Sequence, residues 1–330
     1  MTKLEDLAAS IIVNTERVYS PELAYVTVTG TYLYDLSIAR HRRISPIASD
    51  SWHPDGKGLV GVQIPSDQQC QTVVLIDMDG NTTPVYCMDE NVREPKVSPN
   101  GRHIAWVAHY MGDNKHQDIL CIWDKGKQGL RQQHICRQIL RFGWWNHKTA
   151  NDLFVLGEYH GNHNIIISYD MLGIPTTWSY RGLNITDAEY ISNTVRVLSA
   201  CEGPTNSSHF QPPGPTTQAC GKSLGAFNVQ PGLEKITIDP TGKHVAYNWR
   251  RAVSDCCIRI VNLDAVCCFH RDVEVLPGCM SWSYDGRYFA YSDIKSGAIQ
   301  IVDAEGMEET SAPCNEHILK ICGWRPYVRE

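Results

Sequence analysis

The chain has 330 residues, of which 42% are hydrophobic, 9% aromatic and 20% charged. This ordinary globular composition excludes a largely disordered chain. The 36 acidic residues outnumber the 30 basic ones, giving a net charge of −6, which argues against a general nucleic-acid-binding protein because such proteins carry a basic excess. No apolar run of about 18 residues is present, so no membrane-spanning segment is expected.

The first predicted element is a short amphipathic helix in residues 3–12, within an N-terminal segment of residues 1–13. Apolar residues recur at helical spacing from Leu4 to Ile12. Thr2 and Glu5 fit a capping box, in which each side chain bonds a backbone amide of the other residue. A signal peptide needs an uninterrupted apolar stretch, and the early acidic residues break it. We therefore expect a cytoplasmic or intracellular protein.

A turn motif then recurs along the chain. Each copy reads as the end of one strand, a tight turn with proline or serine, Asp or Asn and glycine, and a second strand. Its clear copies are Ser51–Val60, Val97–Trp106, Ile238–Tyr247 and Trp282–Tyr291, with weaker copies starting at Phe142 and Glu189. Small residues in the second strand (Ala105, Ala246 and Ala290) would let neighbouring sheets approach closely.

The period of this motif predicts the fold class. The equivalent positions, which are 42 to 47 residues apart, are Trp52, Val97, Trp144, Ile191, Ile238, Trp282 and Trp324. Short strands with regular turns at this period are typical of β-propeller blades. We therefore predict an all-β protein, a single closed β-propeller over residues 14–330 with seven blades of four antiparallel strands.

The two ends of the chain are predicted to share one blade. Residues 318–326 read as the first strand of a blade, and residues 20–26 and 32–35 read as its second and third strands. Joining them closes the ring without a long exposed sheet edge. The predicted blades cover residues 47–88, 92–137, 139–180, 185–230, 233–271 and 275–310, and the composite blade joins 314–330 with 14–45.

These turn segments resemble the repeat of TolB-type propellers, which are relatives of WD-repeat propellers. The resemblance covers nearly the whole chain, and it implies the propeller architecture. It does not choose a function, because TolB-like propellers include interaction proteins, gating propellers of prolyl peptidases and some polysaccharide lyases, and function resides in sites carried by a fold.

The candidate binding site is formed by charged residues near the entry to each first strand. In propellers this entry lines the central channel, as the resemblance implies. The residues are Asp50, Arg93, Glu94, Arg141, Asp187, Glu234, Lys235 and Lys320. Their mixed signs suit recognition of a peptide or another polar ligand, and equally suit a water-filled channel.

Other residues are candidates for metal binding or catalysis. His160 and His163, with Glu158 nearby, offer nitrogen and oxygen ligands, although they also suit a polar hairpin turn. The single pairs His134 with Cys136 and Cys268 with His270 are weaker. A G-x-S-x-G match at residues 221–225 lacks the following helix of a hydrolase nucleophile. The sequence predicts no catalytic residue, no resident metal and no cofactor.

The chain contains 13 cysteines and no C-x-x-C pair, so a zinc ribbon is not expected. In a reducing compartment these thiols stay free and behave as small buried hydrophobes. The exception that we consider is a disulfide between Cys201 and Cys220. These residues bracket a Pro/Gly-rich insertion at residues 201–223, and such long loops are frequently functional.

The leading functional hypothesis is a non-catalytic protein-interaction or scaffold module that uses the channel mouth and projecting loops. It implies a protein partner or a larger assembly, and no nucleic acid or membrane. One alternative is a structural subunit of an assembly such as a phage or virus particle. The other is a metal-assisted polysaccharide lyase or hydrolase.

Overall fold

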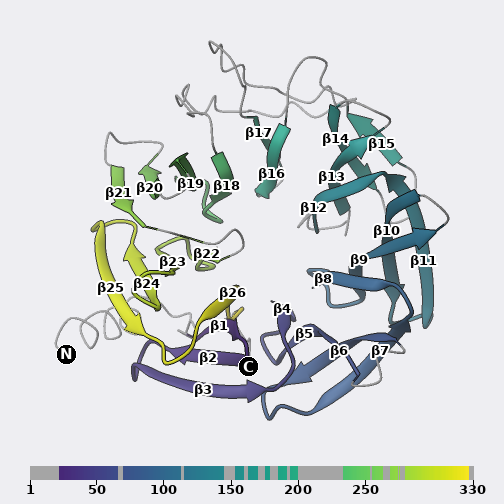
Figure 1. Cartoon of the computed structure of the whole chain (residues 1–330), viewed down its shortest axis with the longest axis horizontal. Coiled ribbons are helices and arrows are strands. Elements are labelled where there is room, and N and C mark those ends of the chain that lie inside the picture. The colour runs from purple at the N-terminus through teal and green to yellow at the C-terminus, as the bar shows by residue number, and fades with distance from the viewer. Residues whose placement is uncertain are drawn as a thin grey trace. The chain divides into compact units, whose positions relative to one another are not determined.

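The computed structural model contains only β-strands among the residues that it describes (Figure 1). These are residues 22–65, 70–112, 115–144, 153–159, 163–169, 175–178, 185–191, 194–199, 233–252, 255–262, 268–273, 275 and 279–326. The chain divides into two compact units, residues 1–135 with 275–330, and residues 136–274. Within the described ranges, no helix has the length and hydropathy needed to span a bilayer.

The first unit contains four antiparallel sheets, each of four strands. Sheet A consists of β26 (Ile318–Trp324), β1 (Glu22–Thr27), β2 (Gly30–Asp35) and β3 (Arg40–Ser45). Sheet B consists of β4 (Ser49–Trp52), β5 (Gly58–Gln63), β6 (Gln71–Asp77) and β7 (Thr82–Met88). Sheet C consists of β8 (Asn91–Val97), β9 (His103–Gly112), β10 (Lys115–Asp124) and β11 (Gly129–Cys136). Sheet G consists of β22 (Met280–Trp282), β23 (Tyr288–Asp293), β24 (Ala298–Asp303) and β25 (Glu308–Pro313).

The second unit contains three antiparallel sheets in its described part. Sheet D consists of β12 (Gln138–Trp144), β13 (Leu153–Tyr159), β14 (His163–Tyr169) and β15 (Pro175–Trp178). Sheet E pairs β16 (Ile185–Ile191) with β17 (Thr194–Ser199). Sheet F consists of β18 (Leu233–Ile238), β19 (His244–Ala252), β20 (Asp255–Asn262) and β21 (Cys268–Asp272).

The predicted turn motif forms the same backbone hydrogen bonds in each clear copy. In one copy the amide of Ser98 donates to the carbonyl of His103, and the amide of Gly101 donates to the carbonyl of Ser98, both at 2.8 Å. Equivalent bonds form at residues 53–58, 239–244 and 283–288. The turn glycines, Gly56, Gly101, Gly242 and Gly286, have φ between 68° and 74°. Glycine is favoured there because it adopts positive φ without steric cost.

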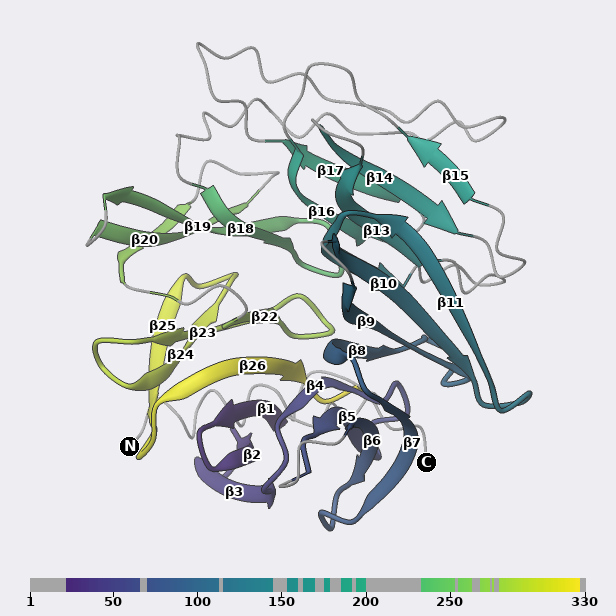
Figure 2. The ribbon, with the colours of Figure 1, turned by 45° about the vertical axis from the view of Figure 1, so that its right-hand side comes forward.

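Sheet A joins the two ends of the described chain, as the sequence predicts. Strand β26 pairs with β1, with Leu23 opposite Trp324, and both views place these two strands side by side (Figures 1 and 2). The amide of Arg325 donates to the carbonyl of Glu22 at 2.8 Å, and the two side chains form an ion pair. These contacts hold the C-terminal strand in the sheet. Closure of a seven-bladed ring stays a prediction.

The core of the first unit lies between neighbouring sheets. Alternate strand residues face each adjoining sheet, so both faces of a sheet are apolar. Between sheets A and B, buried residues include Ala24, Leu33, Trp52, Leu59 and Ile76. Between B and C they include Val60, Val73, Ile104, Trp106 and Ala108. Between G and A they include Leu23, Tyr34, Tyr288, Ala290 and Ile299. Ala105 and Ala290 of this unit and Ala246 of the second unit are fully buried, as their predicted packing role requires.

The expectation of free thiols is wrong for one pair of cysteines. Cys70 precedes β6 and forms a disulfide with Cys87 on β7. The two are near one another because Cys87 lies opposite Thr72 in the β6–β7 register. Among the described cysteines outside this disulfide, Cys121, Cys257 and Cys279 are buried as predicted. The predicted N-terminal helix, the Cys201–Cys220 pair and the 201–223 insertion lie outside the described residues.

Candidate functional site

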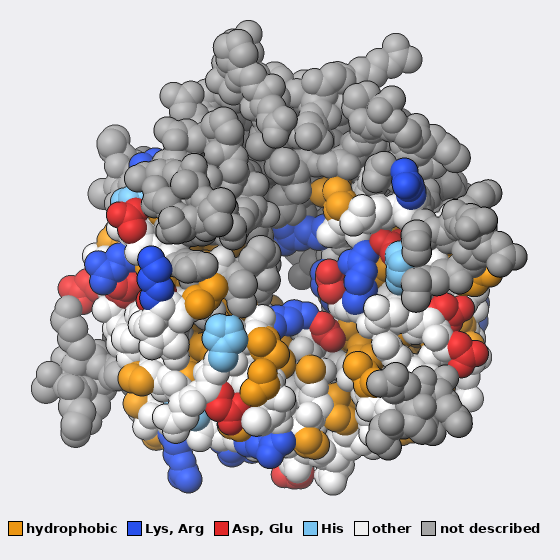
Figure 3. Space-filling view, in the orientation of Figure 1, with side chains coloured by type: hydrophobic (Ala, Val, Ile, Leu, Met, Phe, Trp, Pro, Cys, Tyr) orange, Lys and Arg blue, Asp and Glu red, His pale blue; other side chains and the backbone are white. Residues whose placement is uncertain are grey.

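The first strands of neighbouring sheets bring several of the predicted charged residues together. Strand β26 contacts β4, and β4 contacts β8. As a result the ammonium group of Lys320 forms an ion pair with the carboxylate of Asp50. Figure 3 shows basic and acidic side chains adjoining one another over β4 and β8. We call Asp50, Arg93, Glu94, Lys96 and Lys320, together with His109 on β9 and Asp118 on β10, the first-strand charge cluster.

β-Bulges in two first strands set the direction of two carboxylate side chains, those of Asp50 and Glu94. In β4 the register shifts between Ser49 and Ser51, so that Asp50 is the extra residue. In β8 the register shifts between Arg93 and Lys96, and Glu94 has a φ of 54°. A bulge redirects side chains, and a residue other than glycine at positive φ stores about 1–2 kcal/mol of strain. Strain of this kind gathers at functional sites, which makes this part of β8 a candidate site.

Opposite charges alternate along the part of the cluster that lies on sheet C. The guanidinium of Arg93 donates to Asp118 at 2.6 Å and to Glu94 at 3.3 Å. The ammonium of Lys96 lies 3.5 Å from the other oxygen of Glu94. Asp118 on β10 is buried, and its second oxygen lies 2.8 Å from Nδ1 of His109. Asp118 therefore anchors Arg93, and Arg93 in turn holds Glu94.

The local environment sets the charge of these groups. Burial alone would raise the pKa of Glu94, but the positive charges of Lys96, Lys320 and Arg93 outweigh it and hold the pKa below its usual range. Burial raises the pKa of Asp50, and Lys320 offsets only part of this effect. For Lys320, burial acts to lower the pKa, but the Asp50 carboxylate raises it above its usual value. Glu94 and Lys320 thus carry their charges at neutral pH.

The cluster can form hydrogen bonds and ion pairs with a polar partner. The side chains of Arg93, Glu94, Lys96 and Lys320 are each between 30% and 36% exposed. They present both donors and acceptors, and Leu319, which precedes Lys320 in β26, has an exposed apolar side chain. The nearby thiol of Cys322 is a poor nucleophile, because burial raises its pKa to about 11 and only the thiolate reacts. The arrangement suits binding better than covalent chemistry.

The other predicted binding residues belong to the second unit. Arg141 lies on β12, Asp187 on β16, and Glu234 and Lys235 on β18. The register of β18 shifts between Leu233 and Lys235, so Glu234 also occupies a bulge. These residues therefore take first-strand positions as predicted.

Two of the candidate metal ligands, Glu158 and His163, lie on the two strands of one hairpin of sheet D. Glu158 on β13 pairs in register with Asn164, and Tyr159 pairs with His163 at the start of β14. This agrees with the hairpin that the sequence predicts. His160 and the side chains of Glu158 and His163 lie outside the described part of the chain.

Three members of the cluster were missed by sequence reasoning. Lys96 lies two residues after Glu94 in β8, and this spacing was an available signal. His109 and Asp118 face one another in the β9–β10 register. Their pairing could have been found by aligning these two strands as a hairpin before searching for charged neighbours.

Comparison with known proteins finds similarity in structure only. No protein-family model and no curated protein matches this chain. TolB from Acinetobacter baumannii is similar over 93% of this chain and 67% of its own, with 15% identity and a TM-score of 0.56. The β-propeller domain of the trilobed protease from Pyrococcus furiosus is similar over 88% of both chains, with 11% identity and a TM-score of 0.55.

A third similar structure is the β-propeller domain of Cps50 (Swd1) from Myceliophteria thermophila. The similarity covers 87% of this chain and 92% of that domain, with 12% identity and a TM-score of 0.54. Identities this low establish a shared architecture and leave function open. The sheets, the repeated turns and these three structures together show that the chain has the fold of a TolB-like, WD-repeat-like β-propeller.

Proposed function

We propose that this propeller is a non-catalytic interaction module that binds a protein partner through the first-strand charge cluster. The observation that carries the proposal is the alternation of partly exposed charges from Lys320 and Asp50 to Glu94, Lys96 and Arg93. These charges come from three neighbouring sheets, so the fold holds them in a fixed arrangement. Fixed charges of both signs favour binding by electrostatic complementarity.

The partner that best fits this surface is a polar peptide segment with acidic and basic side chains. Its carboxylates would pair with Lys96 or Lys320, and its basic groups would pair with Glu94. The exposed side chain of Leu319 would add an apolar contact. Charged rims of this kind direct association and select partners, whereas apolar anchors supply much of the affinity.

The experiment is affinity capture from the native source by the full chain, compared with two variants. In the site variant, Glu94→Gln and Lys96→Gln remove one charge of each sign and leave the Asp50–Lys320 and Arg93–Asp118 pairs in place. In the control variant, Arg102→Gln and Asp124→Asn remove an ion pair of 3.1 Å at the turns of sheet C. Both variants keep the net charge of the wild type.

We expect the site variant to weaken binding of a stoichiometric partner about tenfold, which corresponds to about 1.4 kcal/mol. The control variant should bind as the wild type does. Binding that both variants retain equally would place the interaction elsewhere, and deletion of residues 203–218 would then test the inserted loop.

A further inference from the structure

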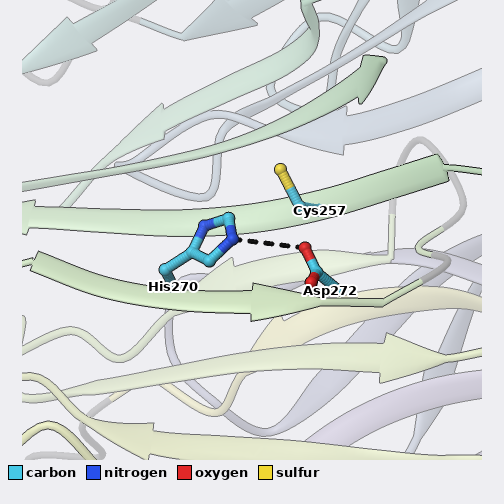
Figure 4. Close-up of side chains that lie close together, drawn as sticks. All are labelled: Cys257, His270 and Asp272. Carbon is cyan, nitrogen blue, oxygen red and sulfur yellow. Dashed lines mark ion pairs between the residues drawn. The ribbon is translucent and has the colours of Figure 1, made fainter. Parts of the chain in front are cut away.

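Three side chains of metal-ligand type lie together on two adjacent strands of sheet F. Cys257 on β20 pairs in register with Asp272 on β21, and His270 lies two residues before Asp272 on the same face of the sheet. Ligand atoms of all three residues lie within 4.8 Å of one another. The Nε2 atom of His270 is 3.2 Å from Oδ1 of Asp272 (Figure 4).

The chemistry of this trio matches the preferences of zinc. Zn²⁺ takes thiolate, imidazole and carboxylate ligands at about 2.0–2.3 Å in a tetrahedral arrangement, which places ligand atoms roughly 3.5 Å apart. Small rotamer changes would bring the three groups to that separation. Cys257 is buried, whereas the side chains of His270 and Asp272 are 35% and 69% exposed. One ligand thus comes from the core, and the solvent side leaves an entry path and a fourth position for water.

Arg259 competes with a cation for this site. It faces His270 in the β20–β21 register, and its Nε–H donates to Nδ1 of His270 at 3.2 Å. This bond leaves the ring proton on Nε2, beside Asp272. A metal bound at Nε2 would require the proton on Nδ1, and two N–H groups cannot then face one another. Arg259 is partly exposed, and a cation at Nε2 would have to displace it from His270.

We propose that Cys257, His270 and Asp272 form a binding site for a zinc-type divalent cation, which is independent of the interaction function proposed above. Two ligands alternate along β21 and the third comes from the opposing position on β20. A bound cation would cross-link β21 to β20 in sheet F. It would replace the ion pair between His270 and Asp272.

The test is titration of the purified full chain with Co²⁺ and then with Zn²⁺. We expect one cation per chain and a near-ultraviolet charge-transfer band from thiolate to cobalt. His270→Ala and Asp272→Asn each remove an exposed ligand, so the variants should fold normally and bind at least about tenfold more weakly. Cys257→Ser should abolish the band. The exposed residue His317 provides the control, since His317→Ala should leave affinity unchanged.

A second variant separates a metal site from a simple ion pair. In Arg259→Gln, the amide oxygen can accept the Nδ1–H of a metal-bound histidine, so binding should tighten several-fold. Zinc should also raise the unfolding temperature of the wild type, and should not do so in His270→Ala. Absence of binding, equal affinity in His270→Ala, or a charge-transfer band that persists in Cys257→Ser would overturn the proposal.

Discussion

Glu316 accepts a hydrogen bond of 2.5 Å from the hydroxyl of Thr27, although 289 positions separate them in the sequence. Thr29 donates to the same oxygen at 2.5 Å, and Tyr32 donates to the other oxygen at 3.1 Å. The hydroxyls of Thr27 and Thr29 hold the pKa of Glu316 below its usual range. A carboxylate just before β26 is thus bound to β1 and β2.

The hydrogen bonds that Glu316 accepts predict a specific dependence of stability on pH. The folded state lowers the pKa of Glu316, so its stabilising contribution is fully present above the unfolded pKa of about 4.3 and is lost as pH falls through the folded pKa. In Glu316→Gln, the free energy of unfolding should decrease at pH 7. The difference from wild type should shrink on acidification, and urea unfolding at a series of pH values measures it.

Glu305→Gln serves as the control for this experiment, because Glu305 is an exposed turn residue. Its unfolding should follow the wild type at every pH. A difference between Glu316→Gln and wild type that stays constant from neutral to acidic pH would contradict the role given to the carboxylate charge.

Alanine substitutions at two glycines with positive φ allow the cost of backbone strain to be compared with the cost of a steric clash. A Cβ added at Gly30 (φ 135°) would lie 2.1 Å from the carbonyl oxygen of Ser45, whereas at Gly297 (φ 64°) it would meet nothing within 4 Å. Gly297→Ala should cost about 1–2 kcal/mol from φ strain alone. Gly30→Ala should cost about 1–3 kcal/mol more, because the backbone must move. Chemical denaturation measures the free energy of unfolding of both variants. An equal decrease in the two would refute the steric argument.

The disulfide between Cys70 and Cys87 is expected to stabilise the β6–β7 hairpin. It closes a loop with a sequence separation of 17, for which the loop-entropy model gives about 3 kcal/mol. Cys70→Ser with Cys87→Ser should lower the free energy of unfolding by about this amount and remove the effect that reductant has through this bond. Peptide mapping after alkylation, with and without reduction, should show these two thiols protected. Full alkylation without reduction would restore the sequence-based expectation of free thiols.

Asp118 is expected to position Arg93 within the first-strand charge cluster. Asp118→Asn keeps the shape of the side chain and removes the charge that faces Arg93. We expect Asp118→Asn to lower the free energy of unfolding by about 1–2 kcal/mol. This is less than for a fully buried pair, because Arg93 is one-third exposed. A double-mutant cycle with Arg93→Ala measures the coupling. Simple additivity of the two losses would show that the contact contributes little.

The repeat could be predicted from the sequence because the residues that define each turn are close together in the chain. Within each turn the glycine, the capping side chain and the start of the next strand fall inside six residues, as in the copy from Ser98 to His103. The repeat period then located Asp50, Arg93, Glu94 and Lys320 on first strands. It also indicated that the C-terminal strand joins the N-terminal ones.

The remaining contacts depend on register, which a repeat period cannot determine. The bulge at Glu94 changes which side chains of β8 face β9, and a shift of one residue reverses the faces of a strand. The partnership of Arg93 with Asp118 follows only once this bulge is known. The Cys70–Cys87 pair likewise depends on the irregularity between Val73 and Val74 in β6.

In sheet A, strands from opposite ends of the described chain pair with each other, and this pairing has a consequence for the nascent chain. Strands β1 to β3 leave the ribosome before their partner β26, which is made 296 residues after β1 begins. At about 5–20 residues per second, the edge of β1 waits roughly 15–60 s for its partner. An unpaired strand edge is a template for association with other chains. Slower translation should therefore lengthen the time in which this edge can associate with other chains, and chaperones that cover it should raise the yield of folded protein.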